Sequence, residues 1–156
     1  PEALHVNRVD VVGDDRGVYA DALKKRCRAL PVKSRGKIRI IPPTELIADF
    51  YAAADLFVLS SKVESFPRVV LEAMAFGLPI ITTPVFGVRE QVVEGENALF
   101  YPPGDNRLLA RQIEYVVCDD ARRLRMAESS RERMSQMTTI DEMVDAYAGI
   151  CREAVS

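Results

Sequence analysis

The stretch SSKVESFPRVVLEAMAFGLPII, residues 60–81, decides the fold of this chain. Within it, Glu72 is the single charge of an otherwise apolar run from Val69 to Gly77. This run predicts a helix at about 67–76 that ends at Gly77 and is largely buried, because it is hydrophobic nearly all round. A buried carboxylate has to be paired or hydrogen-bonded, so Glu72 is expected to have a partner or to bind a ligand.

Strand-like runs flank this helix. DLFVLSS at 55–61 and LPIITT at 78–83 are continuous apolar runs, typical of strands that are buried on both faces. Similar runs near 6–12, 37–41 and 97–102 alternate with helical patterns. This alternation predicts an α/β fold, a Rossmann-like doubly wound parallel sheet in one domain, 1–156, with C-terminal helices at about 121–155.

Composition narrows the class of protein. The chain has 156 residues, 48% of them hydrophobic, and 21 basic against 23 acidic side chains, so no charge bias favours nucleic acid. Without a run of about 18 apolar residues or a signal-peptide pattern, a cytoplasmic protein is expected. The single histidine, His5, disfavours Ser-His and Cys-His mechanisms, and the three scattered cysteines indicate neither disulfides nor a metal site.

The loop at 60–67 is the most informative place for a ligand, because open parallel sheets bind ligands beyond the carboxyl ends of their strands. Pro67 fits the first turn of the following helix, with Ser65 or Glu64 as its N-cap. The free amides at the helix start and the dipole behind them would then suit a phosphate or pyrophosphate. These amides are those of Phe66, Arg68 and Val69.

Two interpretations of Arg68 and Glu72 follow from the residues alone. Four residues apart on a helix, they could form only a surface ion pair, worth a few tenths of a kcal/mol. Alternatively, Arg68 adds charge to a phosphate site, and Glu72, about one turn away, accepts the two hydroxyls of a ribose. The apolar neighbours of Glu72 favour the second interpretation, in which Glu64 lies further out, toward whatever the phosphate carries.

The segment ESFPRVVLE matches the E-x7-E motif of retaining glycosyltransferases of the GT-B fold. Its surroundings, residues 54–105 with EAMAFGLPIITT, FGVREQV and NALFYPPGD at the expected spacings, resemble glycosyltransferase family 4. The chain is similar to the C-terminal, nucleotide-sugar-binding half of such hexosyltransferase-like enzymes of polysaccharide biosynthesis. The resemblance implies that Glu72 holds the ribose diol of the donor and that Glu64 is the catalytic carboxylate near the transferred sugar.

The same resemblance implies the rest of the donor site. Glu90 and Gly87 follow the family pattern as weaker candidates, and no cofactor or metal is expected, since amides, dipole and basic groups meet the charge of the departing diphosphate. The usual Gly-Gly of the loop after residue 83 is Phe86-Gly87 here. The further donor-binding residues implied are Ser65, Phe66, Pro67, Arg68, Val69, Ile41 and Pro42.

Parts of the family's enzymes have no counterpart in this sequence. The family's C-terminal half opens with one more strand, a glycine-arginine loop and a lysine, and a separate N-terminal domain binds the acceptor, which is a sugar, a lipid or a protein. We therefore expect a fragment that is inactive alone, from an enzyme that could associate peripherally with the inner face of the membrane. The strands near 6–12 and 55–60 should be paired directly or leave a gap, which would favour a homodimer.

Three alternatives remain beside the transferase. A non-catalytic nucleotide-sugar-binding module would share the same site. A dinucleotide oxidoreductase is disfavoured because VVGDDRG lacks the G-x-G-x-x-G pattern. A phospho-receiver domain is suggested by Asp14 and Asp15, for which a solvated turn is the preferred interpretation.

Overall fold

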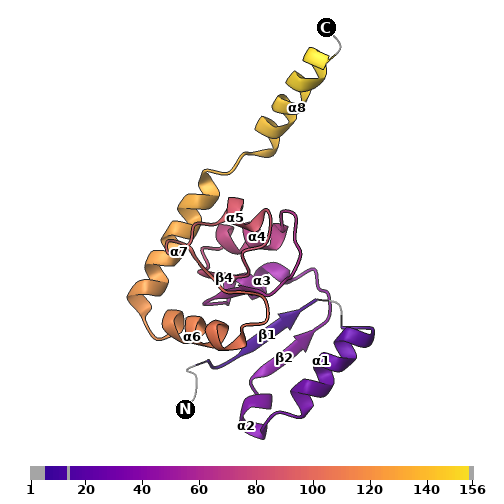
Figure 1. Ribbon diagram of the computed structural model, residues 1–156, viewed down its shortest axis with the longest axis vertical. Coiled ribbons are helices and arrows are strands. Elements are labelled where there is room, and N and C mark those ends of the chain that lie inside the picture. Colours follow the sequence, from indigo (N-terminus) through magenta and orange to yellow (C-terminus); the bar gives the residue numbers. More distant parts are fainter. Residues whose placement is uncertain (1–5, 14, 155–156) are drawn as a thin grey trace.

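The computed structural model describes residues 6–13 and 15–154, which form five strands and eight helices (Figure 1). His5 and Asp14 lie outside the described residues. The strands are β1 (Val9–Val12), β2 (Ile38–Ile41), β3 (Phe57–Leu59), β4 (Ile80–Thr82) and β5 (Ala98–Phe100). The helices are α1 (Val18–Arg28), α2 (Val32–Arg35), α3 (Ile47–Ala52), α4 (Arg68–Ala75), α5 (Val88–Gln91), α6 (Asn106–Val117), α7 (Asp120–Ser135) and α8 (Ile140–Ala154).

The strands form two parallel sheets where one was expected. β1 pairs with β2, and β4 lies between β3 and β5, with Ile80 opposite Phe57 on one side and Ala98 on the other. Among the described strands, β1 and β3 each have one edge without a partner. The sequence predicted that the strands near 6–12 and 55–60 either pair directly or leave a gap. The structure shows no pairing between β1 and β3, so the second arrangement is found.

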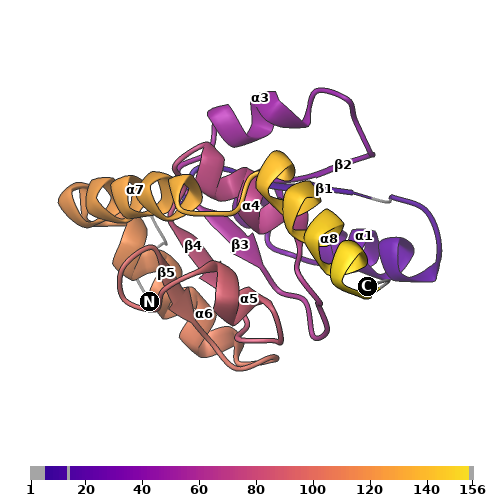
Figure 2. The ribbon, with the colours of Figure 1, turned by 90° about the horizontal axis from the view of Figure 1, so that it is seen from above.

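Helices cover both faces of the sheet β3–β5, as the sequence predicted. Successive residues of β4 point to opposite faces: Ile80 packs with Ala73 and Met74 of α4, and Ile81 packs with Val116 of α6. Both views place α6 on the opposite side of β4 from α4 (Figures 1 and 2). The Rossmann-like α/β class is confirmed, and β4 is buried along its whole length because both faces are covered.

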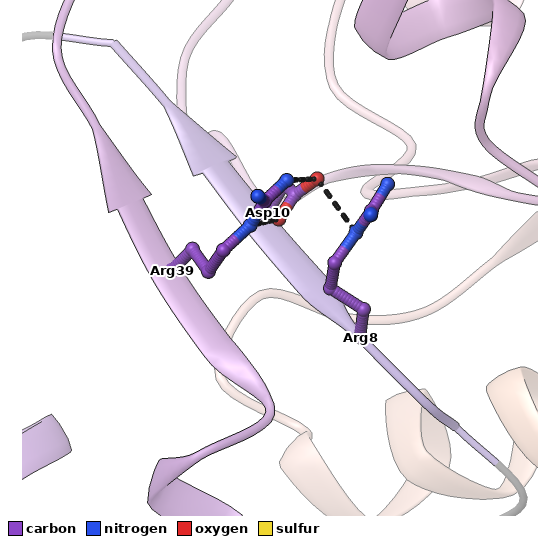
Figure 3. Close-up of polar contacts among 3 residues, drawn as sticks. All are labelled: Arg8, Asp10 and Arg39. Carbon is purple, nitrogen blue, oxygen red and sulfur yellow. Dashed lines mark hydrogen bonds and ion pairs between the residues drawn. The ribbon is translucent and has the colours of Figure 1, made fainter.

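The β1–β2 sheet has much less cover. Between residues 6 and 46, within the part that the structure describes, Ala20 is the one buried hydrophobic side chain, and Val9 of β1 is 43% exposed. A cross-strand ion pair supports the sheet (Figure 3): Arg39 donates from Nε and Nη2 to the two oxygens of Asp10, at 2.7 and 2.8 Å. Arg8 lies on the other side of the same carboxylate, at 3.1 Å. The hydrogen bond from Arg39 holds the pKa of Asp10 below its ordinary value.

The last helix, α8, extends away from the rest of the protein (Figure 1). Residues 136–139 separate it from α7, and its apolar side chains are exposed, as in Ile140 at 75% and Tyr147 at 65%. In the described part of the chain, no helix has both the length and the apolar character that crossing a membrane requires.

Candidate functional site

The start of α4 has no side-chain cap. The N-cap is Pro67, whereas Ser65 or Glu64 was expected, and the helix begins at Arg68. In contrast, Asp105 caps α6 by accepting a hydrogen bond from the amide of Leu108 at 2.9 Å. Proline has no polar side-chain atom for this role, so the amides at the start of α4 stay available for a ligand.

Three backbone amides are open at this helix start. Those of Phe66, Arg68 and Val69 make no hydrogen bond to any residue that the structure describes. The first turn holds no acidic side chain, and Arg68 is exposed without an ion-pair partner in the described residues. Partial positive charge from the amides and a full charge from Arg68 therefore lie together beyond the carboxyl end of β3.

The helix is buried along one face only. Val70, Ala73 and Met74 are fully buried, whereas Val69 is 38% and Phe76 is 39% exposed. The expectation of a largely buried helix is met on this face, whereas the described residues leave the side of Val69 and Phe76 partly exposed. Gly77 ends the helix as predicted, with a φ of 69° that glycine adopts without strain.

Glu72 is half-buried, and its partner is a tyrosine. The hydroxyl of Tyr51, on α3, donates a hydrogen bond to Oε2 of Glu72 at 2.9 Å. Within the described residues no ion pair joins Glu72 to Arg68, so the surface-pair interpretation is wrong. Tyr51 was not among the residues predicted from the sequence; its signal was a tyrosine in an apolar helical stripe, whose hydroxyl needs a partner when buried.

Glu64 lies in the loop after β3 and is anchored to the end of β4. Its Oε1 accepts a hydrogen bond from the hydroxyl of Ser61 at 2.6 Å. The carbonyl of Ser61 accepts in turn from the hydroxyl of Thr83 at 2.5 Å, and Thr83 is fully buried. Glu64 is therefore held within a hydrogen-bonded loop at the carboxyl edge of the sheet.

The loop at 84–87 packs directly on the loop at 60–67. A Cβ on Gly87 would overlap the carbonyl oxygen of Ser65 and would approach the ring of Phe66 to 3.2 Å, so only glycine fits. Its neighbour Phe86 is 70% exposed and has a φ of 38°. A side chain in this left-handed region costs about 1–2 kcal/mol, which places backbone strain beside the candidate site.

Gln91 ties α5 to the start of α4 and was also missed. It is fully buried, and its Nε2 donates to the carbonyl of Pro67 at 3.1 Å. The adjacent Glu90 has an exposed side chain, and its backbone carbonyl accepts from Nη2 of Arg133 at 2.6 Å. The available signal for Gln91 was its helical spacing from the apolar residues Val88 and Val92, which places its amide on an apolar face where it needs a partner.

Ile41 and Pro42 lie away from these loops in the sheet order, at the carboxyl end of β2 in the other sheet. Ile41 is half-buried and Pro42 is exposed. The structure thus brings together the residues from 61 to 91 and leaves this pair on a separate sheet. Within the described residues, no group of three His, Cys, Asp or Glu side chains could hold a metal ion.

Comparisons with known proteins agree with this architecture. Residues 2–133 match the family described as glycosyl transferases group 1. The chain is 34% identical over 137 residues to the lipopolysaccharide core biosynthesis glycosyltransferase LpsE of Rhizobium meliloti, covering 88% of this chain and 39% of that protein. It is 34% identical over 112 residues to a D-inositol 3-phosphate glycosyltransferase of Corynebacterium urealyticum, covering 70% and 26%. The chain thus spans well under half of the length of these curated relatives.

Solved structures share the fold. Sucrose-phosphate synthase from Thermosynechococcus elongatus superposes with a TM-score of 0.80 at 27% identity, covering 96% of this chain and 39% of that one. Anabaena HepE in complex with UDP gives a TM-score of 0.81 at 22% identity, covering 94% and 41%. The fold is that of the C-terminal, Rossmann-like half of GT-B glycosyltransferases. Since the family match extends over most of its length, the chain belongs to the glycosyl transferases group 1.

Proposed function

We propose that this chain binds the nucleoside diphosphate of a sugar donor and serves as the donor half of a retaining, family 4 glycosyltransferase. The observation that carries this proposal is the uncapped start of α4. Three open amides and Arg68 lie there, about one turn from the carboxylate of Glu72. Charge and geometry together suit an anion that is linked to a diol.

Each part of the donor would have its own group. The amides of Phe66, Arg68 and Val69 would bind the diphosphate, with Ser65 and Pro67 in the same loop. Glu72 would accept the ribose hydroxyls, and the segment at 41–42 would lie near the base. Glu64 would contact the transferred sugar, while Gly87 and Glu90 would shape the wall of the site.

The chemistry would be electrostatic. As the bond between the sugar and the diphosphate breaks, negative charge grows on the leaving oxygen, and preorganised amides, the dipole of α4 and Arg68 would stabilise it. No metal is needed in this scheme. Retention at the anomeric carbon, and an acceptor bound by a further domain, remain part of the proposal, as does inactivity of this chain by itself.

The relatives support the ligand class. HepE has been solved with UDP and with UDP-glucose, and the relatives named above are glycosyltransferases. The alternative of a non-catalytic binding module shares every feature of the proposed donor site and differs only in the absence of transfer. Transfer to an acceptor by a longer protein that contains this chain separates the two.

Calorimetric titration with UDP, GDP and ADP tests the proposal. We expect one of them to bind to the wild type and Glu72→Ala to weaken it at least tenfold. Glu114→Ala, which removes an exposed carboxylate from α6, is the matched control and should bind like the wild type. No binding of any nucleotide would contradict a donor site in this chain, and equal binding by Glu72→Ala would contradict the ribose assignment.

A further inference from the structure

Tyr51 is held from several sides. Its side chain is 7% exposed, and its ring stacks on Phe76 with centroids 5.5 Å apart and planes at 21°. The ring of Phe57 on β3 lies 6.0 Å away at 46°. These contacts fix the direction of the Tyr51 hydroxyl independently of Glu72, because they act on the ring alone.

The hydroxyl is a permanent donor. Burial, and then the hydrogen bond to Glu72 and its charge, raise the pKa of Tyr51 well above its ordinary value. The phenol therefore keeps its proton at neutral pH. A protonated tyrosine donates a hydrogen bond to the carboxylate of Glu72, and because it is uncharged it does not repel that carboxylate.

This donor leaves most of the carboxylate free. Tyr51 occupies one position on Oε2, whereas Oε1 of Glu72 has no hydrogen-bond partner in the described residues. A carboxylate has about four lone-pair sites, so acceptors remain for two further hydroxyls. Without Tyr51, a half-exposed glutamate would sample several rotamers.

We propose that Tyr51 is a positioning residue: its hydroxyl orients the carboxylate of Glu72 so that the remaining lone pairs accept the two hydroxyls of the donor ribose. This inference rests on the proposed function. The residue acts through Glu72 and does not touch the substrate itself. Besides Glu72 on α4, ribose recognition would thus depend on a residue of α3, outside the 60–91 segment.

The test compares ribonucleotides with their 2′-deoxy forms. The tightest of UDP, GDP and ADP and its 2′-deoxy analogue are titrated into the wild type, Tyr51→Phe, Glu72→Gln and the double variant. We expect Tyr51→Phe to weaken the ribonucleotide roughly tenfold, as for loss of a hydrogen bond to a charged group, and to weaken the 2′-deoxy form, which keeps only the 3′-hydroxyl, by about threefold at most. In the Glu72→Gln background, Tyr51→Phe should have no further effect.

Two controls separate positioning from a structural role. Tyr51→Phe keeps the ring contacts, so we expect it to fold, and its thermal unfolding is measured beside that of Tyr19→Phe. Tyr19 lies on α1 and is 83% exposed, so the Tyr19→Phe variant should bind nucleotides like the wild type. Should Tyr51→Phe not fold, Glu72→Asp keeps the charge but shortens the side chain away from the hydroxyl. The same loss of ribose preference is then expected, and a wild-type preference in either variant would overturn the inference.

The outcomes also distinguish a failure of the inference about Tyr51 from a failure of the proposed donor-binding function. If the wild type binds no nucleotide, or Glu72→Gln binds like the wild type, the donor-site proposal fails and the inference fails with it. If Glu72→Gln loses the ribose preference while Tyr51→Phe retains it, only the role of Tyr51 is refuted.

Discussion

Replacing Gly87 by alanine should separate the two loops of the candidate site. Gly87 has a φ of −63°, which any residue adopts, so backbone conformation does not restrict the position. A Cβ there would overlap the carbonyl oxygen of Ser65, and this atom belongs to the backbone and cannot rotate away. The loop at 60–67 must therefore move, together with the amides that it carries.

The expected change in the free energy of unfolding is the difference between two opposing contributions. Alanine in place of glycine stabilises by about 0.4–1 kcal/mol through the unfolded chain, whereas forced overpacking costs about 1–3 kcal/mol. Gly36→Ala is the matched control, because Gly36 has the same φ of −63° and its Cβ would meet nothing closer than 3.7 Å. We expect Gly36→Ala to be as stable as the wild type or slightly more so, and Gly87→Ala to be less stable by about 1–2 kcal/mol.

Urea unfolding followed by circular dichroism measures both variants, and nucleotide titration then reports on the loop. For a chain of this size, the expected loss corresponds to a decrease in Tm of about 2–8 °C. Binding should weaken in Gly87→Ala and stay unchanged in Gly36→Ala. Equal stability and equal binding of the two variants would refute the contact between Gly87 and Ser65 as a determinant of the site.

Three further predictions concern other parts of the protein. Tyr101→Phe should stabilise by about 1 kcal/mol in urea unfolding, because the buried Tyr101 hydroxyl has no hydrogen-bond partner in the described residues; a clear loss of stability would mean that it has one. Asp10→Asn should destabilise the protein at pH 7, and the difference should vanish in acid: the pKa of Asp10 is lowered in the folded state, so its contribution is present above the ordinary value of 3.8 and is lost as the pH falls through the folded pKa. A difference that does not decrease as the pH falls below 3.8 would exclude the ion pair with Arg39 as its cause. The free edges of β1 and β3 should favour a homodimer, and a monomeric mass by light scattering at high concentration would count against it.

Much of the fold could be predicted from the sequence because its signals are local. The apolar runs at 55–61 and 78–83 predicted β3 and β4, and Gly77 marked the end of α4 correctly. These features depend on capping chemistry and periodicity, which act within a few residues. The N-cap of α4 was assigned to Ser65 or Glu64 because their side chains can accept a hydrogen bond from a helix amide. The path of the backbone decides which residue precedes the helix, and this residue is Pro67.

The side-chain partners could not be predicted in the same way. Glu72 needed a partner, but Arg68 at i−4 and Tyr51, twenty-one residues earlier in the chain, were equally compatible with the composition. Tyr51 is the partner because α3 packs beside α4 and brings its hydroxyl within hydrogen-bonding distance of Glu72. Gln91 and Gly87 likewise have roles only because α5 and its preceding loop fold against residues 65–67.

The sequence by itself determined the parallel α/β class, because the hydrophobic periodicity and the helix-end signals lie in neighbouring residues. It also predicted the edge and the two carboxylates of the proposed donor site, which stay predictions. Only the tertiary structure decided that the strands form two sheets, that α4 keeps one face open, and that Tyr51 and Ser61 hold Glu72 and Glu64. The reason is physical: hydrogen bonds and steric contacts between segments depend on distances that arise only when the chain is packed.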